Sequence, residues 1–536
     1  MYTEDIMSFF PLKEARRSQE LVIREIDKAY RTGTRTVILE APVGSGKSAI
    51  GVTFARAFGS SHTITPRKSL QDQYYADFSD DLVLMKGRSS YPCTINSGPG
   101  TIRQVLLDIS KGQVQAPVYG APNCATAPCR SDPEIWRDCK NNRGGCPYSV
   151  AIEVAQKSDI IVHNLHSFIF QTAFTERFDK REIMIIDEVH EVEGMLREFL
   201  VKKITVGEIV PDSDMPTGEF SSDVWMTYLL QDKFVPEVNA LERSRKIKEP
   251  EYETGAESYI RRVTELLSGD GKYVPTKKIN FQGRKEISTT FEFTPVSLGS
   301  AAEDSLLSYG ERQLLMSGTI YDKDVFCRTL GLDPKTVHFI RIGSTFPLKN
   351  RPIYMKPDYQ VNTSFAKWNE NFEEMMDKIQ KISAIFDDVK GLIHAPSYEA
   401  AHQIAAAFPN KRAYTHDKNN FQHSLESFFE EDSNRIFISP VCQQGVDFKN
   451  DRARFQIITR VPFLSTQDPF VEYQIKNNFP WYNHQALVTW GQQCGRINRN
   501  EEDYGATFCL DSRFHEFIRK NAKKIPKWMM DSLIYK

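Results

Sequence analysis

Residues 36–55 read TVILEAPVGSGKSAIGVTFA, and this stretch decides the fold. A β-branched run leads directly into a glycine-rich turn, and an apolar helical pattern follows at once, which is the context that a P-loop requires. Gly44, Ser45 and Gly46 form a turn whose backbone N–H groups curl around a phosphate at the helix N-terminus. The sequence therefore predicts an ATP-binding loop in an α/β protein.

The residues that end this turn carry the chemistry of the site. Lys47 supplies a cation to the β and γ phosphates, and Ser48 offers a hydroxyl ligand to Mg²⁺. A P-loop also needs a second strand that ends in acidic residues, and residues 183–188 read IMIIDE. We expect Asp187 to hold the magnesium and Glu188 to act as the general base on the attacking water. The pattern thus predicts ATP hydrolysis as well as ATP binding.

Further β-branched runs are each followed by a helical pattern, which is typical of a parallel α/β sheet. They fall into an early set and a late set, and cores stop growing at roughly 250–300 residues. A chain of 536 residues therefore needs more than one domain, and we predict two tandem α/β lobes. The strands are expected at residues 36–39, 183–186, 313–316, 391–394, 435–438 and 455–458.

The composition is that of a folded protein, and its net charge does not indicate the class of its partner. The net charge is only -2, so any contact with a polyanion must come from local basic patches. No apolar run approaches the roughly 20 residues needed to span a bilayer, and the first residues lack the order of a secretory signal. We therefore expect no membrane partner and a cytoplasmic location, nucleoid-associated or in a virus-infected cell.

Five of the nine cysteines fall between Cys93 and Cys146. In a chain without a secretory signal, such clustering favours thiols or metal ligands over a disulfide framework. Zinc accepts four thiolates, but zinc modules usually carry short Cys-x-x-Cys pairs, and this segment has none. Structural zinc and plain buried thiols are two alternatives for this segment.

Motifs stand in a fixed order along the chain. The P-loop is followed by DEVH at residues 187–190, SGT at 317–319 and QQCGRINR at 492–499. This series resembles that of superfamily 2 helicases. The motifs that narrow the resemblance to the XPD/DinG branch are KGRSSYPC at 86–93, CPY at 146–148, GVDF at 445–448, DYG at 503–505 and LDSR at 510–513.

The resemblance covers most of the chain and implies a domain plan. Two RecA-like lobes would carry a cysteine-rich insertion and a mainly helical arch insertion, both in the first lobe. The implied boundaries are 1–92, 147–201 and 300–322 for lobe 1, 93–146 for the Fe–S domain, 202–299 for the arch and 323–536 for lobe 2.

The same resemblance implies a [4Fe–4S] cluster held by four thiolates. Cys93 and Cys146 belong to motifs of the branch, and Cys129 with Cys139 is the preferred middle pair. A middle pair made of Cys124 and Cys129 is the competing choice.

The resemblance also assigns residues around the nucleotide. An arginine presented across a cleft stabilises charge on the transferring phosphoryl group and makes hydrolysis depend on lobe closure. The implied contacts are Arg16 and Gln19 at the adenine, His190 in the acidic motif, and Gly445, Asp447, Gln492, Arg496 and Arg499 from the second lobe.

Proteins that move on single strands combine cations along the phosphate backbone with aromatic faces that stack on bases. The motif context places candidates of both kinds in each lobe. They are Thr65, Arg67, Lys68, Arg88, Tyr91, Ser397 and Tyr398.

The resemblance implies an ATP-dependent DNA helicase that translocates 5′→3′ on single-stranded DNA and unwinds duplexes in repair, replication or recombination. Its expected partners are single-stranded and forked duplex DNA, with RNA in hybrids as a further one, and it is expected to act as a monomer. The alternative is an ATP-gated nucleic-acid clamp, translocase or remodelling subunit that does not separate strands. Both share every ATP motif, so strand displacement distinguishes them.

Overall fold

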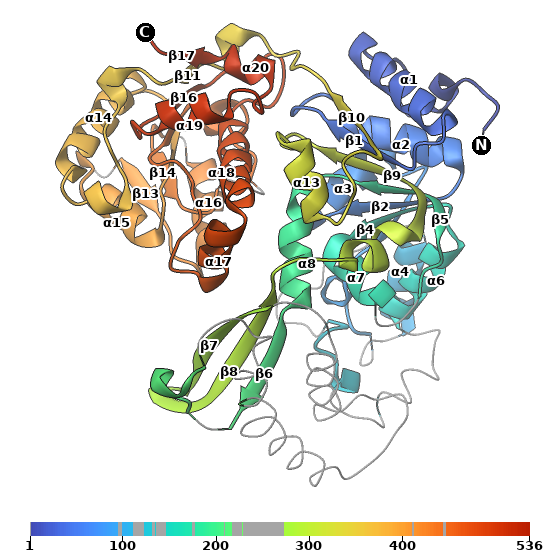
Figure 1. Cartoon of the computed structure of the whole chain (residues 1–536). Helices are drawn as coiled ribbons and strands as arrows, with labels where there is room; N and C mark the ends of the chain where they lie inside the picture. The colour runs from blue at the N-terminus through green and yellow to red at the C-terminus, as the bar shows by residue number, and fades with distance from the viewer. Residues whose placement is uncertain are drawn as a thin grey trace.

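The structure is a computed structural model that describes residues 2–94, 99–110, 123–130, 135, 146–173, 177–207, 209–216, 228, 273–409, 412–431, 433–442 and 446–536. In this part of the chain two α/β lobes stand side by side, and a small sheet extends below them (Figure 1). No helix within the described ranges is long and apolar enough to cross a membrane.

The first lobe is built on a seven-stranded parallel sheet with the order β10-β1-β9-β5-β2-β4-β3. Its strands are β1 (Thr36–Glu40), β2 (Ser61–Thr65), β3 (Val83–Met85), β4 (Ile160–Asn164), β5 (Arg181–Ile186), β9 (Gly310–Ser317) and β10 (Val337–Arg341). Its helices are α1 (Arg17–Arg31), α2 (Lys47–Phe58), α3 (Lys68–Phe78), α4 (Pro99–Ser110), α6 (Pro147–Lys157), α7 (Leu165–Ala173), α8 (Val192–Leu200), α12 (Ala301–Ser305) and α13 (Lys323–Thr329).

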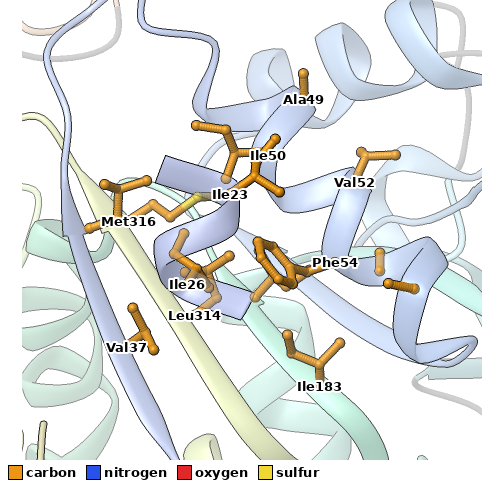
Figure 2. Close-up of a cluster of buried hydrophobic side chains, with 14 of the residues drawn as sticks. Ile23, Ile26, Val37, Ala49, Ile50, Val52, Phe54, Ile183, Leu314 and Met316 are labelled. Carbon is orange, nitrogen blue, oxygen red and sulfur yellow. The ribbon is translucent and has the colours of Figure 1, made fainter. Parts of the chain in front are cut away.

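Helices cover both faces of this sheet, so its central strands are buried along their whole length. All five residues of β1 are buried, which explains why the strand reads as a continuous apolar run rather than an alternating one. One face packs against α1 and α2, as Figure 2 shows. The side chains that meet there include Ile23, Ile26, Ile50, Phe54, Val37, Ile183 and Leu314. This packing fixes the P-loop between β1 and α2.

The second lobe repeats the plan with a seven-stranded parallel sheet of order β13-β14-β12-β15-β16-β11-β17. Its strands are β11 (Ile353–Tyr354), β12 (Gly391–His394), β13 (Ala413–Thr415), β14 (Ile436–Ser439), β15 (Phe455–Ile458), β16 (Ala506–Cys509) and β17 (Leu533–Ile534). Its helices are α14 (Phe372–Ile385), α15 (Tyr398–Ala406), α16 (Phe421–Glu430), α17 (Pro469–Asn477), α18 (Phe479–Cys494), α19 (Phe514–Asn521) and α20 (Lys527–Met530). The prediction of two parallel α/β lobes is confirmed, and each predicted strand lies inside an observed strand or is shifted from it by one residue.

The boundary predicted between residues 322 and 323 is wrong, because the first sheet continues to β10. This strand pairs in parallel with β1, so residues up to 341 belong to the first lobe. The link is reinforced by Glu40, whose Oε2 accepts a hydrogen bond from Arg341 Nε at 2.5 Å. β10 is an edge strand with exposed positions, and its sequence, VHFIR, lacks the long apolar run that marks a buried strand.

The predicted arch at residues 202–299 differs from expectation where the structure describes it. Its described strands β6 (Lys202–Val206), β7 (Tyr273–Gln282) and β8 (Lys285–Pro295) form an antiparallel sheet, and α8 leads into it (Figure 1). Phe291 and Phe293 are buried on one face of β8 and alternate with polar residues, which is the period of a strand. The prediction of a mainly helical segment is wrong for these strands. Residues 217–227 and 229–272 lie outside the described residues.

The base of this sheet touches the second lobe. Val274 of β7 shares a buried cluster with Phe470 of α17 and Trp481 of α18. The insertion is therefore packed against both lobes at its root.

Candidate active site

The P-loop needs its glycines for two separate reasons. Gly44 and Gly46 have φ angles of 78° and 80°, a region that strains residues with a Cβ. A Cβ on Gly46 would also lie 2.1 Å from Gln19 Nε2, and one on Gly44 would lie 2.4 Å from the ring of Phe346. The loop is therefore closely covered by α1 on one side and by the segment between the lobes on the other.

The side chains of Arg16 and Gln19 contact the P-loop. The Arg16 Nη1 group donates to the Gly44 carbonyl at 2.7 Å, and Gln19 Nε2 donates to the Ser45 carbonyl at 3.3 Å. Gln19 Oε1 accepts from the Arg16 backbone N–H at 2.9 Å, which ties the start of α1 to itself. These contacts place both side chains at the nucleotide loop, and their role at the adenine stays a prediction.

Lys47 and Glu188 face each other across the site. Lys47 Nζ lies 3.6 Å from Glu188 Oε1 and donates to the Ala41 carbonyl at 3.4 Å. The lysine is 9% exposed, so this cation is held where a triphosphate would enter. Glu188 adopts a left-handed backbone conformation with φ of 49°, which is uncommon for a residue with a side chain and is frequent at functional sites.

The two carboxyl groups at the end of β5 have opposite electrostatic surroundings. Burial, together with the neighbouring Glu188 charge, raises the pKa of Asp187 to about 6. Burial also acts to raise the pKa of Glu188, but Lys47 and His190 outweigh it and hold that pKa below its usual range. Glu188 therefore stays ionised at neutral pH, as a general base must be, and a cation beside Asp187 would stabilise the charge of that carboxylate.

His190 connects the acidic motif to the next one along the chain. Its Nδ1 lies 2.8 Å from Ser317 Oγ and 3.3 Å from Glu188 Oε2. Ser317 Oγ in turn accepts a hydrogen bond from the Thr319 backbone N–H at 3.1 Å. Motifs separated by more than a hundred residues thus share one hydrogen-bond network.

The second lobe completes this network with Gln492 and Arg496. Gln492 Nε2 donates to Thr319 Oγ1 at 2.7 Å, and Gln492 Oε1 accepts from Arg496 Nη2 at 2.9 Å. Arg496 also donates to the Val446 carbonyl at 3.0 Å and is only 6% exposed. Burial, followed by the nearby Arg499 charge, lowers the pKa of Arg496 to about 9. Within the described residues no carboxylate forms an ion pair with Arg496, so this buried arginine has room to gain from an anionic ligand.

Arg499 has its own partner in the second lobe. Its Nε donates to Asp447 Oδ1 at 2.8 Å, which brings together two residues that the sequence assigns to the nucleotide. Gly445, assigned with them, lies outside the described residues.

A cavity of about 370 Å³ opens between the lobes, within the usual size of ligand pockets. Its lining includes Glu188, His190, Gln492, Arg496 and Arg499.

One inter-lobe contact was missed by the sequence prediction. Glu193, 8% exposed at the start of α8, accepts from Trp481 Nε1 at 2.5 Å and from Gln485 Nε2 at 2.7 Å. Arg197 Nη2 donates to the same carboxylate at 2.8 Å. An acidic residue on a helix carries no local signal of such a role, because its partners come from a helix nearly 300 residues away.

The candidates for nucleic-acid contact in the first lobe are placed differently from one another. Lys68 is exposed at the start of α3, and Arg67 beside it pairs with Glu191 at 2.8 Å. Thr65 is buried, with its hydroxyl on the Arg67 and His163 carbonyls. Only the first two leave charge near the surface for a phosphate.

Two further candidates lie beside the cysteine segment. The guanidinium of Arg88 lies over the Tyr148 ring at 4.8 Å. Tyr91 is fully buried, with its hydroxyl oxygen accepting from the Lys86 backbone N–H at 3.2 Å. The prediction that Tyr91 stacks on a base is therefore wrong for this structure, because its ring is already covered by Tyr148.

In the second lobe, Ser397 is occupied in capping a helix. Its Oγ accepts from the Ala400 backbone N–H at 3.1 Å at the start of α15. Tyr398 is half-buried and meets the His416 ring edge-on. Both stand at the carboxyl end of β12, where ligands approach open parallel sheets.

Three of the described cysteines, Cys93, Cys124 and Cys146, lie in the same part of the first lobe. The Cys124 backbone N–H donates to the Tyr91 carbonyl at 2.9 Å, and Pro92 bridges Asn123, which places Cys93 and Cys124 on neighbouring strands of chain. A hydrogen bond with the Cys124 thiol lowers the pKa of Cys146 to about 5. In the part of the chain that the structure describes, no three His, Cys, Asp or Glu side chains converge tightly enough to hold a metal ion.

Of the preferred cluster ligands, Cys139 lies outside the described residues, and Cys129 stands half-buried in a short 3-10 turn, Pro128–Arg130. The competing residue, Cys124, is the one in contact with Cys146. The contacts of the described thiols thus favour Cys124 as a neighbour of Cys93 and Cys146.

Comparison with known proteins agrees with this geometry. Residues 12–206 match the family described as type III restriction enzyme, res subunit, and residues 379–532 match the helicase C-terminal domain. The chain is 20% identical over 590 aligned residues to the ATP-dependent DNA helicase YoaA of Haemophilus influenzae, covering 91% of this chain and 90% of that protein. It is 30% identical over 274 residues to a regulator of telomere elongation helicase 1 homolog of Drosophila grimshawi, covering 44% of this chain and 27% of the relative.

Solved structures share the fold at low identity. An XPD helicase structure matches with a TM-score of 0.60 and 15% identity over 98% of this chain and 100% of its own. The S. tokodaii Xpd4 structure matches with a TM-score of 0.57 and 12% identity over 97% of this chain and 100% of its own. The order of motifs and the paired lobes agree with these relatives, and the chain is similar to superfamily 2 helicases of the XPD/DinG type.

Proposed function

We propose that this chain is an ATP-dependent DNA helicase that moves 5′→3′ along single-stranded DNA and unwinds duplexes in repair, replication or recombination. The observation that carries the proposal is the shared network across the cleft, in which Gln492 of the second lobe bonds Thr319 of the first and holds Arg496 beside it. Hydrolysis at such a site depends on the relative position of the two lobes. A site of that kind converts ATP turnover into movement.

The residues divide the chemistry between them. Glu188 would take a proton from the water that attacks the γ phosphorus, and the bond from that phosphorus to the β-phosphate oxygen breaks to release ADP and phosphate. Lys47 would hold the phosphates, and the charges of Arg496 and Arg499 would stabilise the phosphoryl group in transit. Bound Mg²⁺, held by Ser48 and Asp187, would neutralise charge on the phosphate oxygens.

The burial of Arg496 supports its role in catalysis. Its guanidinium is oriented by Gln492 and the Val446 carbonyl, so it needs little reorganisation when the cleft closes. Gln492 is a positioning residue in this scheme, because it bonds both the arginine and Thr319.

The proposed partners are single-stranded and forked duplex DNA, with RNA in hybrids as a further one, bound by a monomer. The proposed path of the single strand crosses both lobes. It is supported by Lys68 and Arg67 in the first lobe and by Ser397 and Tyr398 in the second. The insertion rooted on β6, β7 and β8 is proposed as the arch, and residues 93–146 as the Fe–S domain.

We further propose that the cysteine segment holds a [4Fe–4S] cluster. The choice of Cys93, Cys124 and Cys146 is supported by the contact of the Cys124 thiol with Cys146 and by the backbone bridge that brings Cys93 near Cys124, and the fourth ligand comes from Cys129 or Cys139. Single Cys→Ser variants, purified without oxygen, would be assayed for iron and sulfide per chain. Loss of iron in the Cys124 variant is expected. Full iron content in that variant would return the middle pair to Cys129 and Cys139, and stoichiometric zinc without iron would overturn the cluster.

Duplexes with a 5′ or a 3′ single-stranded tail test the function and its polarity. The helicase proposal predicts ATP-dependent strand displacement from the 5′-tailed substrate and little from the 3′-tailed one. Hydrolysis stimulated by single strands without displacement from either duplex would instead support an ATP-gated clamp or remodelling subunit. An RNA tracking strand in parallel reactions would test the hybrid.

A further inference from the structure

Tyr74 lies inside the first lobe with its hydroxyl at the magnesium residues. The side chain comes from the second half of α3, is 0% exposed, and donates a hydrogen bond to Asp187 Oδ2 at 3.1 Å. The side chain of Ser48 lies beside the same hydroxyl. A tyrosine O–H has one proton to donate, so while that proton goes to Asp187 the oxygen can interact with Ser48 only as an acceptor.

Ser48 and Asp187 belong to different motifs, and Tyr74 touches both. Ser48 stands in the first turn of α2 after the P-loop, whereas Asp187 directly follows β5. Groups that hydrogen-bond metal ligands from behind fix their orientation, and their loss costs about 10–100-fold in metal affinity. A single hydroxyl that orients both proposed ligands presets the distance between them.

The other end of α3 is attached to the same acidic segment. Arg67, the N-cap of α3, is paired with Glu191, four residues after Asp187. Arg67 and Tyr74 are seven residues apart, about two helical turns, so they lie on one face of the helix. Lys68, exposed at the same end, is a proposed contact with the nucleic-acid backbone. One rigid helix therefore joins the surface proposed for DNA to the residues proposed for magnesium.

A purely structural reading treats Tyr74 as a buried tyrosine whose hydroxyl found an acceptor. Tyr30 is such a case in the same core cluster, where its hydroxyl donates to the Gln313 carbonyl at 2.9 Å. The difference lies in the partners. Tyr30 bonds a backbone carbonyl of β9, whereas Tyr74 bonds Asp187 and lies beside Ser48, the two residues proposed to hold the metal.

We propose that Tyr74 is a positioning residue that presets Ser48 and Asp187 for magnesium and transmits movement of α3 on single-strand binding to that pair. The transmission of movement from single-stranded DNA through α3 rests on the proposed function. The presetting of Ser48 and Asp187 concerns magnesium and nucleotide alone.

The test compares Tyr74→Phe with Tyr30→Phe. Each variant removes one buried tyrosine hydroxyl from the same cluster, so each is expected to lose a similar amount of stability. The readouts are the affinity for a fluorescent ADP analogue with and without Mg²⁺, the Mg²⁺ concentration that half-saturates hydrolysis, the stimulation of hydrolysis by single-stranded DNA, and the affinity for single-stranded DNA.

For Tyr74→Phe we expect the half-saturating Mg²⁺ concentration to rise about tenfold. The ADP analogue should bind more weakly only when Mg²⁺ is present, stimulation by single-stranded DNA should fall, and DNA affinity should stay unchanged. Tyr30→Phe should keep the wild-type values of all four. Equal Mg²⁺ dependence in the two variants would overturn the positioning role. A shifted Mg²⁺ dependence with full DNA stimulation would overturn transmission through α3.

Failure of the proposed function gives a different pattern. Wild-type hydrolysis would then be indifferent to single-stranded DNA, while the Mg²⁺-dependent ADP affinity of the two tyrosine variants would still differ.

Discussion

The carboxylate of Glu193 in the first lobe accepts a hydrogen bond from the indole N–H of Trp481 in the second, at 2.5 Å. Glu193 follows the proposed general base Glu188 by five residues. Trp481 opens α18, the helix whose far end leads into Arg496. The contact between Glu193 and Trp481 therefore connects the segment of the proposed general base, Glu188, to the helix that leads into Arg496. This contact lies outside the cleft itself.

Replacing Glu193 by alanine should loosen this contact. The change leaves the donors of Trp481, Gln485 and Arg197 without their shared acceptor, and each buried group left unpaired costs about 1–3 kcal/mol. We expect turnover of ATP to fall about tenfold, as a misplacement in the cleft would produce, and the melting temperature to drop. Steady-state kinetics and thermal melts check both.

The matched control is Glu198→Ala, which removes an exposed carboxylate from the same helix. Glu193→Gln, which keeps an acceptor oxygen, should fall between the wild type and Glu193→Ala. Equal turnover in Glu193→Ala and Glu198→Ala would show that the contact does not bear on the cleft.

Arg496→Lys should remove catalysis without removing nucleotide binding. Lysine keeps a charge but cannot reach the Gln492 side chain and the Val446 carbonyl together, so the cation loses its fixed place. Arginines of this kind contribute about 10³–10⁵-fold to turnover, and we expect a loss near the lower end of that range. Turnover and ATP affinity, measured together, check the prediction. Arg519→Lys, a change at an exposed arginine, serves as the control. Turnover of Arg496→Lys within twofold of the wild type would contradict the prediction.

Two buried histidines predict how stability depends on pH. His62 Nδ1 lies 3.1 Å from His163 Nε2, and burial lowers the pKa of His62 to about 3. Burial, together with the charge of His62, also lowers the pKa of His163. In the unfolded chain histidine titrates near 6.5, so the unfolded state binds protons first and stability is lost as pH falls from about 6.5 toward 3.

For His62 alone this loss is about 2 kcal/mol at pH 5. Urea unfolding at pH 7 and pH 5 would measure it, with His62→Gln as the comparison. The wild type should lose more unfolding free energy between the two pH values than the variant does. Parallel losses would mean that the pair accepts a proton while folded.

Local patterns predicted the parts of the fold that local physics determines. The strand before the P-loop, the glycines with positive φ and the acidic end of β5 each follow from a short stretch of chain, and the structure has all three. β10 could not be assigned this way, because an edge strand shows no long apolar run. The prediction that Tyr91 stacks on a base failed because the burial of an aromatic ring depends on what packs over it. In this structure Tyr148 packs against the Tyr91 ring.

The contacts that unite the site were beyond the reach of sequence. In the sequence, Glu193 and Tyr74 look like any other helix residues. Their roles come from contacts with α18 and with the end of β5, which only the folded structure brings beside them. Their partners are far along the chain, so neither spacing nor periodicity marks them. The motifs identify which residues do the chemistry, and the tertiary structure identifies which residues hold them in place.

Lys47→Ala should abolish hydrolysis while single-stranded DNA still binds. Lys47 Nζ lies 3.6 Å from Glu188 Oε1, and loss of the lysine leaves the phosphates without that charge. Hydrolysis assays and fluorescence anisotropy with a labelled single strand measure the two properties. Retention of full turnover would show that nucleotide is hydrolysed elsewhere.

Strand displacement from a 5′-tailed DNA duplex is the most direct test of the central claim, that hydrolysis between these two lobes drives unwinding. The wild-type protein with ATP and Mg²⁺ should release the labelled strand, and neither Lys47→Ala with ATP nor the wild type with a non-hydrolysable ATP analogue should do so. Displacement by all three would contradict the account, as would wild-type hydrolysis stimulated by DNA with no strand released.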